Sequence, residues 1–200
     1  MKKILLIILL LPFFTVSQDL PVVLRSDSGC EGFEGKDRKK YIDRKGDTLP
    51  ITEACSFCTD PVGDVLASST LIDKSGRYNY DASNLGDADF NTAWVEGEDG
   101  YGIGEFIEFN VGGVLLCLTI YNGHQKSIDL WKNNSRVKTF KVYRNNSPIC
   151  FLELEDIMSG QSFSLEEVGG SDRLGFEIVE IYKGDKWKDV CVSDILITGI

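Results

Sequence analysis

The residues best suited to chemistry lie in one segment, residues 84–105. This segment reads NLGDADFNTAWVEGEDGYGIGE and combines acidic side chains, an Asn-Thr pair and several glycines with three aromatic residues. Gly, Asp and Asn at this density favour loops, because they allow positive φ angles and local hydrogen bonds to the backbone. We expect Phe90, Trp94 and Tyr101 to anchor the loop to a core. A rigid, oxygen-rich loop predicts a site for a hard cation or a polar ligand.

Residues of the common catalytic constellations are scarce. His124 is the single histidine of the sequence, and no Gly-x-Ser-x-Gly or phosphate-binding glycine loop precedes an expected helix. Carboxylate pairs occur at i, i+2 spacing, as in Glu96 with Glu98, but in β-structure such pairs more often line a solvated face. The sequence therefore predicts a protein that is not an enzyme. A carboxylate-dependent glycoside hydrolase is the less favoured alternative.

The elements that must position these residues are short β-strands. Runs rich in Val, Ile, Phe, Tyr and Thr alternate with turn clusters and cover residues 65–71, 106–111, 114–121, 137–144, 149–155, 162–165, 174–182 and 190–198. Residues 145–148 (NNSP) have the composition of a hairpin turn, and residues 127–132 are long enough for one helical turn. Without a long helical stripe or a βαβ rhythm, the pattern predicts an all-β, eight-stranded jelly-roll sandwich.

The first 17 residues have the features of a signal peptide. Lys2 and Lys3 precede an apolar run at residues 4–14, and small residues follow at 15–17. The run is shorter than the roughly 20 residues that span a bilayer, so we expect no transmembrane anchor. The predicted mature chain begins at Gln18 and is secreted or periplasmic.

Residues 18–61 form a separate, loosely organised segment before a domain at residues 62–200, and residues 31–47 of this segment are charged and broken by glycines. An even number of cysteines in an exported chain favours disulfides, and Cys30 is a plausible partner for Cys55 or Cys58. The pairing stays open. Cys117 lies in an expected strand and is either a buried free thiol or part of a disulfide.

The mature chain is strongly acidic. Of 21 basic and 31 acidic residues, two lysines belong to the signal peptide, which leaves a formal charge of −12. Such a surface repels phosphate backbones, so nucleic acid is excluded as a partner, and lipid binding is disfavoured. Acidic loops are better suited to cations and sugar hydroxyls.

Five motifs, in order, resemble a known family. Residues 87–94 (DADFNTAW) resemble the D-G-D-x-x-T-A-W loop of discoidin-type domains, the coagulation factor type C and galactose-binding-like family. GYGIGEF at 100–106, IYNG at 120–123, NNSRVK at 133–138 and VCVSDI at 190–195 follow. Together they resemble the type C-like domain attached to bacterial NAD-glycohydrolase toxins, a domain implicated in glycan binding and toxin translocation. The resemblance covers residues 62–200, and nothing in the sequence resembles the NAD-cleaving domain.

The resemblance implies a structural Ca²⁺ beside the central loop. The implied ligands are the side chain of Asp87, backbone carbonyls of Asn84 and Asp89, the hydroxyl and carbonyl of Thr92, and the carboxylate of Asp194. Ala88 stands where the family usually has Gly, and Asp194 is one methylene shorter than the usual Glu. The alternative is that Asp87 and Thr92 only cap the turn, without a metal.

The resemblance also implies a set of glycan-binding positions, namely Glu96, Asn122, Gly123, Asn133 and Arg136. We expect four further candidate ligand residues to be exposed, one of which would stack on a sugar: Tyr78, Tyr80, His124 and Trp131. The structural alternatives are that Trp94 is a core anchor, that Asn122 and Gly123 form a turn, and that Arg136 pairs with Glu96.

These inferences predict an exported, non-catalytic module that binds a glycan or glycoconjugate through loops at one end of a β-sandwich. The alternative is an adhesion or structural module in which the same surface contacts a protein partner.

Overall fold

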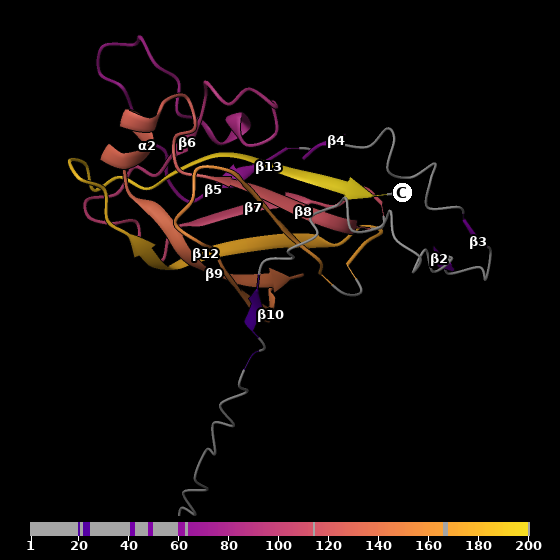
Figure 1. Cartoon of the computed structure of the whole chain (residues 1–200). Coiled ribbons are helices and arrows are strands. Elements are labelled where there is room, and N and C mark those ends of the chain that lie inside the picture. Colours follow the sequence, from indigo (N-terminus) through magenta and orange to yellow (C-terminus); the bar gives the residue numbers. More distant parts are fainter. Residues whose placement is uncertain are drawn as a thin grey trace, which may run out of the picture.

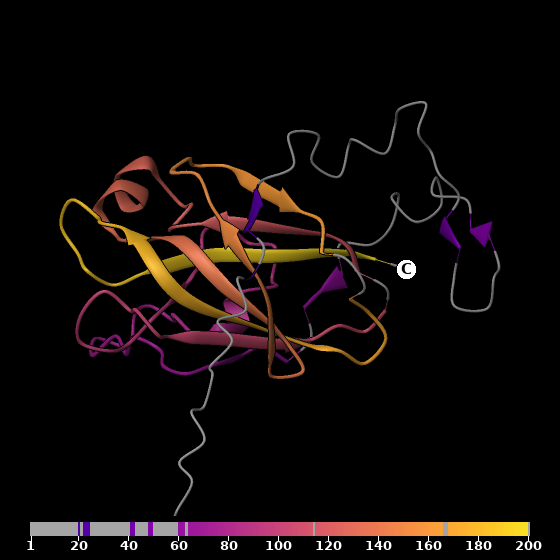
Figure 2. The ribbon, with the colours of Figure 1, turned by 90° about the horizontal axis from the view of Figure 1, so that it is seen from below.

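The chain forms a two-layered β-sandwich (Figures 1 and 2). The computed structural model describes residues 20, 22–24, 41–42, 48–49, 60–62, 64–113, 115–165 and 168–199. Two sheets pack face to face, and the loops at one end carry the short helix α2 (Ile128–Asn133). The C-terminus lies at the opposite end of the sandwich in both views.

The first sheet has six strands in the order β1-β10-β9-β12-β7-β5. Their bounds are β1 Val22–Leu24, β10 Ser147–Glu153, β9 Arg136–Arg144, β12 Arg173–Tyr182, β7 Phe106–Asn110 and β5 Leu66–Ala67. Neighbouring strands are antiparallel except β1, which pairs parallel with β10. The long strands β9 and β12 form the centre, with Val142 opposite Phe176.

The second sheet has the order β11-β8-β13-β4, and β6 also pairs with β13. The bounds are β11 Gly160–Phe163, β8 Leu115–Asn122, β13 Cys191–Gly199, β4 Asp60–Pro61 and β6 Trp94–Val95. A separate pair joins β2 (Tyr41–Ile42) to β3 (Thr48–Leu49). All described pairings of the second sheet are antiparallel.

The core lies between the sheets and is dominated by aromatic side chains. The largest fully buried ones are Trp94, Phe109, Phe140, Phe163 and Phe176. Phe176 stacks on Phe109 at 5.5 Å between ring centroids and meets Phe140 edge-on at 5.7 Å. Such offset and edge-to-face pairs are the favoured arrangements of buried rings. Strand alternation thus places one face of each sheet in the core and the other toward solvent.

The predicted β-sandwich is confirmed. Each of the eight expected runs contains a strand, and residues Asn145 and Asn146 form the expected turn with φ angles of 50° and 68°. Residues near 127–132 form α2, capped by the hydroxyl of Ser127, which accepts from the Leu130 N–H. The sequence reasoning missed β6, a two-residue strand inside the segment expected to be only a loop.

Two further expectations concern the cysteines and the chain's beginning. Cys117 is disulfide-bonded, so the buried free thiol is the wrong alternative there. Cys150 and Cys191 are buried and free. The predicted signal peptide and the cysteines at 30, 55 and 58 lie outside the described residues. Within the described ranges, no helix is long and apolar enough to cross a membrane.

Candidate ligand-binding site

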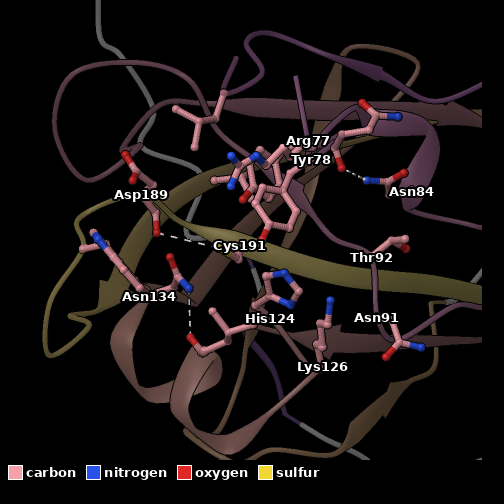
Figure 3. A pocket seen from close by; sticks show the side chains of 16 residues that line it. Arg77, Tyr78, Asn84, Asn91, Thr92, His124, Lys126, Asn134, Asp189 and Cys191 are labelled. Carbon is pink, nitrogen blue, oxygen red and sulfur yellow. Dashed lines mark hydrogen bonds between the residues drawn. The ribbon is translucent and has the colours of Figure 1, made fainter. Parts of the chain in front are cut away.

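Loops at the α2 end of the sandwich enclose a cavity of about 840 Å³ (Figure 3). Figure 3 shows His124 near the middle, with Arg77 and Tyr78 above it, Lys126 below it and Asn134 to its left. Four separate stretches of sequence line it: Leu71, Arg77, Tyr78, Asn79 and Tyr80; Asn84, Asn91, Thr92 and Val95; His124, Lys126, Leu130 and Asn134; Trp187, Asp189 and Cys191.

The first wall is a loop ordered by Asp73. The carboxylate of Asp73 accepts hydrogen bonds from the Ser75 hydroxyl and from the backbone N–H groups of Ser75, Arg77 and Tyr78. These bonds, those of Ser75 most of all, lower the pKa of Asp73 to about 2. The turn therefore fixes the backbone of Arg77 and Tyr78. The ring of Tyr78, 59% exposed, stacks on Tyr80 at 6.1 Å, so the rim carries an aromatic face.

The opposite wall includes His124, which lies three residues before the Ser127 cap of α2. His124 is only 8% exposed, yet its Nδ1 atom has no hydrogen-bond partner among the described residues. Burial, helped by the nearby Lys126 ammonium, lowers the pKa of His124, so the ring is neutral at pH 7. A buried polar atom without a partner is unusual and indicates a ligand or water in the cavity.

The third wall is the loop between β12 and β13. The backbone N–H of Trp187 donates to the Asn133 carbonyl at 2.8 Å, which ties this loop to the end of α2. Trp187 is 37% exposed and lies under the ammonium of Lys186, 4.3 Å from the ring centroid. Asp189 adds a carboxylate to the lining. Trp187 and Asp189 thus offer the cavity an apolar ring and a hydrogen-bond acceptor.

Cys191 lies in the lining but is a poor nucleophile. Complete burial and the nearby charge of Asp189 raise the pKa of the Cys191 thiol, and its Sγ faces the Asp189 carbonyl at 3.9 Å. Reactive cysteines need a lowered pKa and an accessible thiolate. The proximity of Cys191 to His124 in the lining therefore does not make a catalytic pair.

Most residues implied as glycan ligands lie outside the cavity lining, in a buried polar cluster of Asn122, Gly123, Trp131 and Arg136. The amide of Asn122 binds both backbone groups of Val137, at 2.7 and 3.0 Å. Gly123 has a φ of 79°, and a Cβ there would lie 2.6 Å from the Trp131 ring. The Trp131 indole donates to the Asn122 carbonyl at 3.0 Å. These side chains bind one another and the backbone.

Arg136 completes this buried polar cluster. Its guanidinium pairs with Asp156 through Nε and Nη2, at 2.6 and 3.0 Å, and lies 4.3 Å from the centroid of the Trp131 ring. It also donates to two backbone carbonyls, those of residues 131 and 134. The expected alternative, a pair between Arg136 and Glu96, is wrong.

Glu96 and Asn133 are also outside the cavity lining. Glu96 is fully buried and accepts from the backbone N–H groups of Glu98 and Val190, at 2.9 and 3.3 Å. Burial raises the pKa of its carboxyl group. The Asn133 carbonyl accepts from the loop at 186–187. Of the seven expected ligand residues, the structure places His124 alone in the lining.

The expectations of exposure had mixed outcomes. Tyr78 is exposed as predicted and Tyr80 is half-buried, whereas His124 and Trp131 are each 8% exposed, so both were wrongly expected at the surface. Trp94 is fully buried, which confirms the core-anchor alternative, and its indole donates to the Ser69 carbonyl at 3.0 Å. Phe90 is 40% exposed and packs on Tyr121 at 4.3 Å.

The residues implied as calcium ligands gather next to the cavity, and Asn84 and Thr92 belong to both groups. Asp194 is fully buried; the backbone N–H groups of Ile195 and Ala88 lie near its carboxylate, but neither makes a well-formed hydrogen bond to it, and the described residues offer no other partner. Burial, followed by the negative charge of Asp87, raises the pKa of Asp194 to about 6. Two neighbouring carboxylates, one buried without a partner, fit a site for a divalent cation.

The loop around Asp87 is held by its own hydrogen bonds and contains a residue with a positive φ angle. Ala88 adopts a φ of 56°, the left-handed conformation that the family's usual Gly would adopt without strain. The Thr92 hydroxyl donates to Asp87 Oδ2 and to the Asp89 carbonyl, both at 2.8 Å. No cluster of three or more His, Cys, Asp or Glu side chains occurs among the described residues. The donor set is therefore mainly carbonyl and hydroxyl oxygen, which suits Ca²⁺ better than a transition metal.

Sequence reasoning missed several cavity residues, above all Arg77, Trp187 and Asp189. Each lies outside the motifs that carried the resemblance. The dense turn residues around Asp73 and the isolated Trp187 in a lysine-rich loop were the available signals.

A β-sandwich with a ligand-sized cavity among the loops at one end defines a class of binding domains. A family model described as the NAD glycohydrolase translocation F5/8 type C domain matches residues 56–198, so the chain belongs to that family. This confirms the discoidin-type resemblance. No curated protein matches the sequence.

Solved structures from Clostridium perfringens share the fold. The CBM32-1 and CBM32-2 domains of ZmpB in complex with GalNAc match with a TM-score of 0.53 and 11% identity, over 72% of this chain and 34% of that chain. CBM32-3 from a family 31 glycoside hydrolase matches with a TM-score of 0.53 and 17% identity, over 68% of this chain and 88% of that chain. CpGH89CBM32-5 in complex with GalNAc-β-1,3-galactose matches with a TM-score of 0.50 and 14% identity, over 67% of this chain and 93% of that chain. The chain spans about a third of the ZmpB chains it matches first, and these identities show the fold alone.

Proposed function

We propose that this protein is an exported, non-catalytic module that binds a glycan in the loop-end cavity. The observation that carries the proposal is the buried ring of His124, whose unpartnered Nδ1 atom lies in a cavity with aromatic side chains on its rim. The family and the fold support it, since two of the similar structures hold GalNAc or GalNAc-β-1,3-galactose. The cavity volume lies within the range of roughly 300–1,000 Å³ typical of small-molecule sites.

The lining offers what a sugar needs. A pyranose ring has an apolar C–H face and a polar edge of hydroxyl groups. The rings of Tyr78 and Trp187 are exposed enough to receive the apolar face. His124, Asn134 and Asp189 provide donors and acceptors for the hydroxyls on rigid elements below the rim.

We include a structural Ca²⁺ in the proposal. Asp87 and Asp194 would supply its carboxylates, with oxygens of Asn84, Asp89 and Thr92 completing the shell. The support is the buried, unpartnered carboxylate of Asp194. The ion would neutralise the two carboxylates and hold in place the loop that forms one wall of the cavity.

A glycoside hydrolase is less well supported. Such enzymes generally use two carboxyl groups on opposite sides of the scissile bond. Among the described residues that line the cavity, Asp189 is the one acidic residue. Glu96 and Glu98, the pair considered from the sequence, are outside the lining, and Glu96 is engaged with backbone N–H groups.

The test is a glycan-array screen of residues 18–200 with disulfides intact, in Ca²⁺ and in chelator. We expect saturable binding that Tyr78→Ala and His124→Gln weaken. Ile72→Ala is the matched control, because Ile72 is 81% exposed on the same loop and does not line the cavity. A folded protein that binds no glycan in either buffer would contradict the proposal.

A protein partner is the second candidate function. Ile72 and Ile103 are large apolar side chains, 81% and 57% exposed, on loops of the domain. Exposed apolar residues mark an interaction site where they form one contiguous patch, and this alternative requires such a patch around Ile72. This alternative predicts self-association or partner capture that Ile72→Asp abolishes, together with no response to sugars. Light scattering after size exclusion measures the former.

A further inference from the structure

Ion pairs are confined to one part of the described structure. Each joins a cation of β9 or β12 to a nearby carboxylate, and the pairs are Arg136–Asp156, Lys138–Glu180, Arg144–Asp172 and Arg173–Glu108. Their N–O distances range from 2.6 to 3.1 Å. The cations of the six-stranded sheet are therefore largely neutralised within the protein.

The cations around the cavity are not paired in this way. Arg77 and Lys126 line the cavity, and neither takes part in an ion pair among the described residues. On the neighbouring loop, Lys186 lies over Trp187, while Lys183 and Lys188 lie 5.1 and 5.7 Å from the centroid of the Tyr101 ring.

Three acidic residues near the cavity are bound to their own turns. Asp73 accepts from the backbone of residues 75–78, Asp81 caps Ser83, and Asp89 accepts from the backbone and side chain of Asn91. Their oxygens are bound to the turns that contain them. Among the described residues, Arg77 and Lys126 thus carry unpaired charge in the cavity lining, whereas these three acids stabilise their own turns.

Inside the cavity, two cations oppose one acid. Arg77 and Lys126 lie on opposite sides of His124 (Figure 3), and Asp189 is the acid of the described lining. The field of Lys126 reaches the cavity, because its charge contributes to the lowered pKa of His124. A positive excess here does not follow from composition, since the whole chain has a formal charge of −10.

We infer that the ligand is an acidic sugar, one that carries a carboxylate such as a sialic or uronic acid residue; this inference rests on the proposed glycan binding. Arg77 is the residue for the carboxylate, because a guanidinium binds it through two parallel hydrogen bonds. Lys126 adds attraction from the other side. Asp189 accepts hydrogen bonds from sugar hydroxyls, and Tyr78 receives the apolar face of the ring.

The experiment compares acidic sugars with matched neutral ones. Titration calorimetry measures the binding of 3′-sialyllactose against lactose, and of trigalacturonate against its methyl ester, to residues 18–200 in Ca²⁺. We expect at least one acidic probe to bind about tenfold more tightly than its neutral counterpart, as a charge-assisted contact implies. Raising the salt concentration should reduce this preference and leave the affinity for the neutral sugar unchanged.

Two variants locate the effect. Arg77→Gln and Lys126→Gln should each lower the affinity for the acidic probe by a larger factor than the affinity for its neutral partner, so that the tenfold preference shrinks. Both side chains are exposed, so the fold is retained. Lys74→Gln is the control, because Lys74 lies on the loop of Arg77 but outside the lining.

The outcomes separate the two proposals. Equal affinity for acidic and neutral members of both pairs overturns the inference and leaves glycan binding intact. If none of the four probes binds, the result of the glycan array decides between the two proposals. Binding of neutral sugars alone on the array overturns the inference, and binding of no sugar at all overturns the proposed function. A preference for acidic probes that survives Arg77→Gln and Lys126→Gln also contradicts the assignment.

Discussion

The buried carboxylate of Asp194 gives the sharpest test of the calcium proposal, through the substitution Asp194→Asn. Without metal, burial and the charge of Asp87 raise the pKa of Asp194 from 3.8 to about 6. A carboxyl group whose folded pKa is raised binds its proton more tightly in the folded state. It therefore favours folding at acidic pH, and this contribution is lost as the pH rises from about 4 through 6.

The magnitude follows from that shift. About two pKa units correspond to roughly 3 kcal/mol against the charged form at neutral pH. Asparagine has nearly the same shape and no charge, but its amide also lacks partners, which costs roughly 1 kcal/mol. In chelator at pH 7.5, Asp194→Asn should therefore raise the free energy of unfolding by about 1–3 kcal/mol, the opposite of the usual effect of a core substitution.

Calcium should reverse this order. An ion that binds only the folded state stabilises it by about 2.7 kcal/mol at a hundredfold excess over Kd. Urea unfolding at pH 7.5, in chelator and across a Ca²⁺ titration, measures both effects, with the exposed Asp64→Asn as control. The reasoning is refuted if Asp194→Asn is less stable than the wild type in chelator, or if calcium stabilises both proteins equally.

Three other outcomes are expected. Arg136→Ala should lower the free energy of unfolding, measured in urea, by about 2–4 kcal/mol, because it leaves Asp156 and two backbone carbonyls without their donor. Ligand binding by the folded variant should be preserved. His124 has a lowered pKa, so the wild type should lose stability as the pH falls below 6.5, and urea titrations should show a smaller loss in His124→Gln. Because Asn84 and Thr92 belong to the cavity lining and to the proposed calcium shell, calcium should tighten glycan binding several-fold in calorimetry.

The strands were predictable because their signal is local. Alternation along residues such as Phe140 and Val142 reports which face of a strand is buried, and the Asn145-Asn146 pair tolerates the positive φ angles of a tight turn. The strand β6 was not predictable in the same way. Two residues, Trp94 and Val95, are too few to show a period, and they pair with a strand almost a hundred positions later.

The cavity was harder to predict because it is a property of the tertiary structure. Its lining comes from residues 71–95, 124–134 and 187–191, which are far apart in the sequence, and each stretch contributes side chains with no common pattern. Trp131 illustrates the difficulty. A tryptophan on a short polar helix suggests an exposed platform, yet its ring packs on Arg136 and over Gly123, and it is buried. Nothing in the sequence near Trp131 shows that Arg136 will lie against it.

Motif positions and ligand positions therefore separate into two layers. In the lower layer, Asn122, Trp131 and Arg136 use their polar atoms on one another and on the backbone, so they join the loops and leave nothing for a ligand. In the upper layer, Arg77 and Tyr78 are exposed and are held by backbone bonds to Asp73 rather than through their own side chains. Substitutions in the upper layer can change the ligand at little cost in stability. Under the proposed function, the recognisable motif thus forms the scaffold, and the rim selects the ligand.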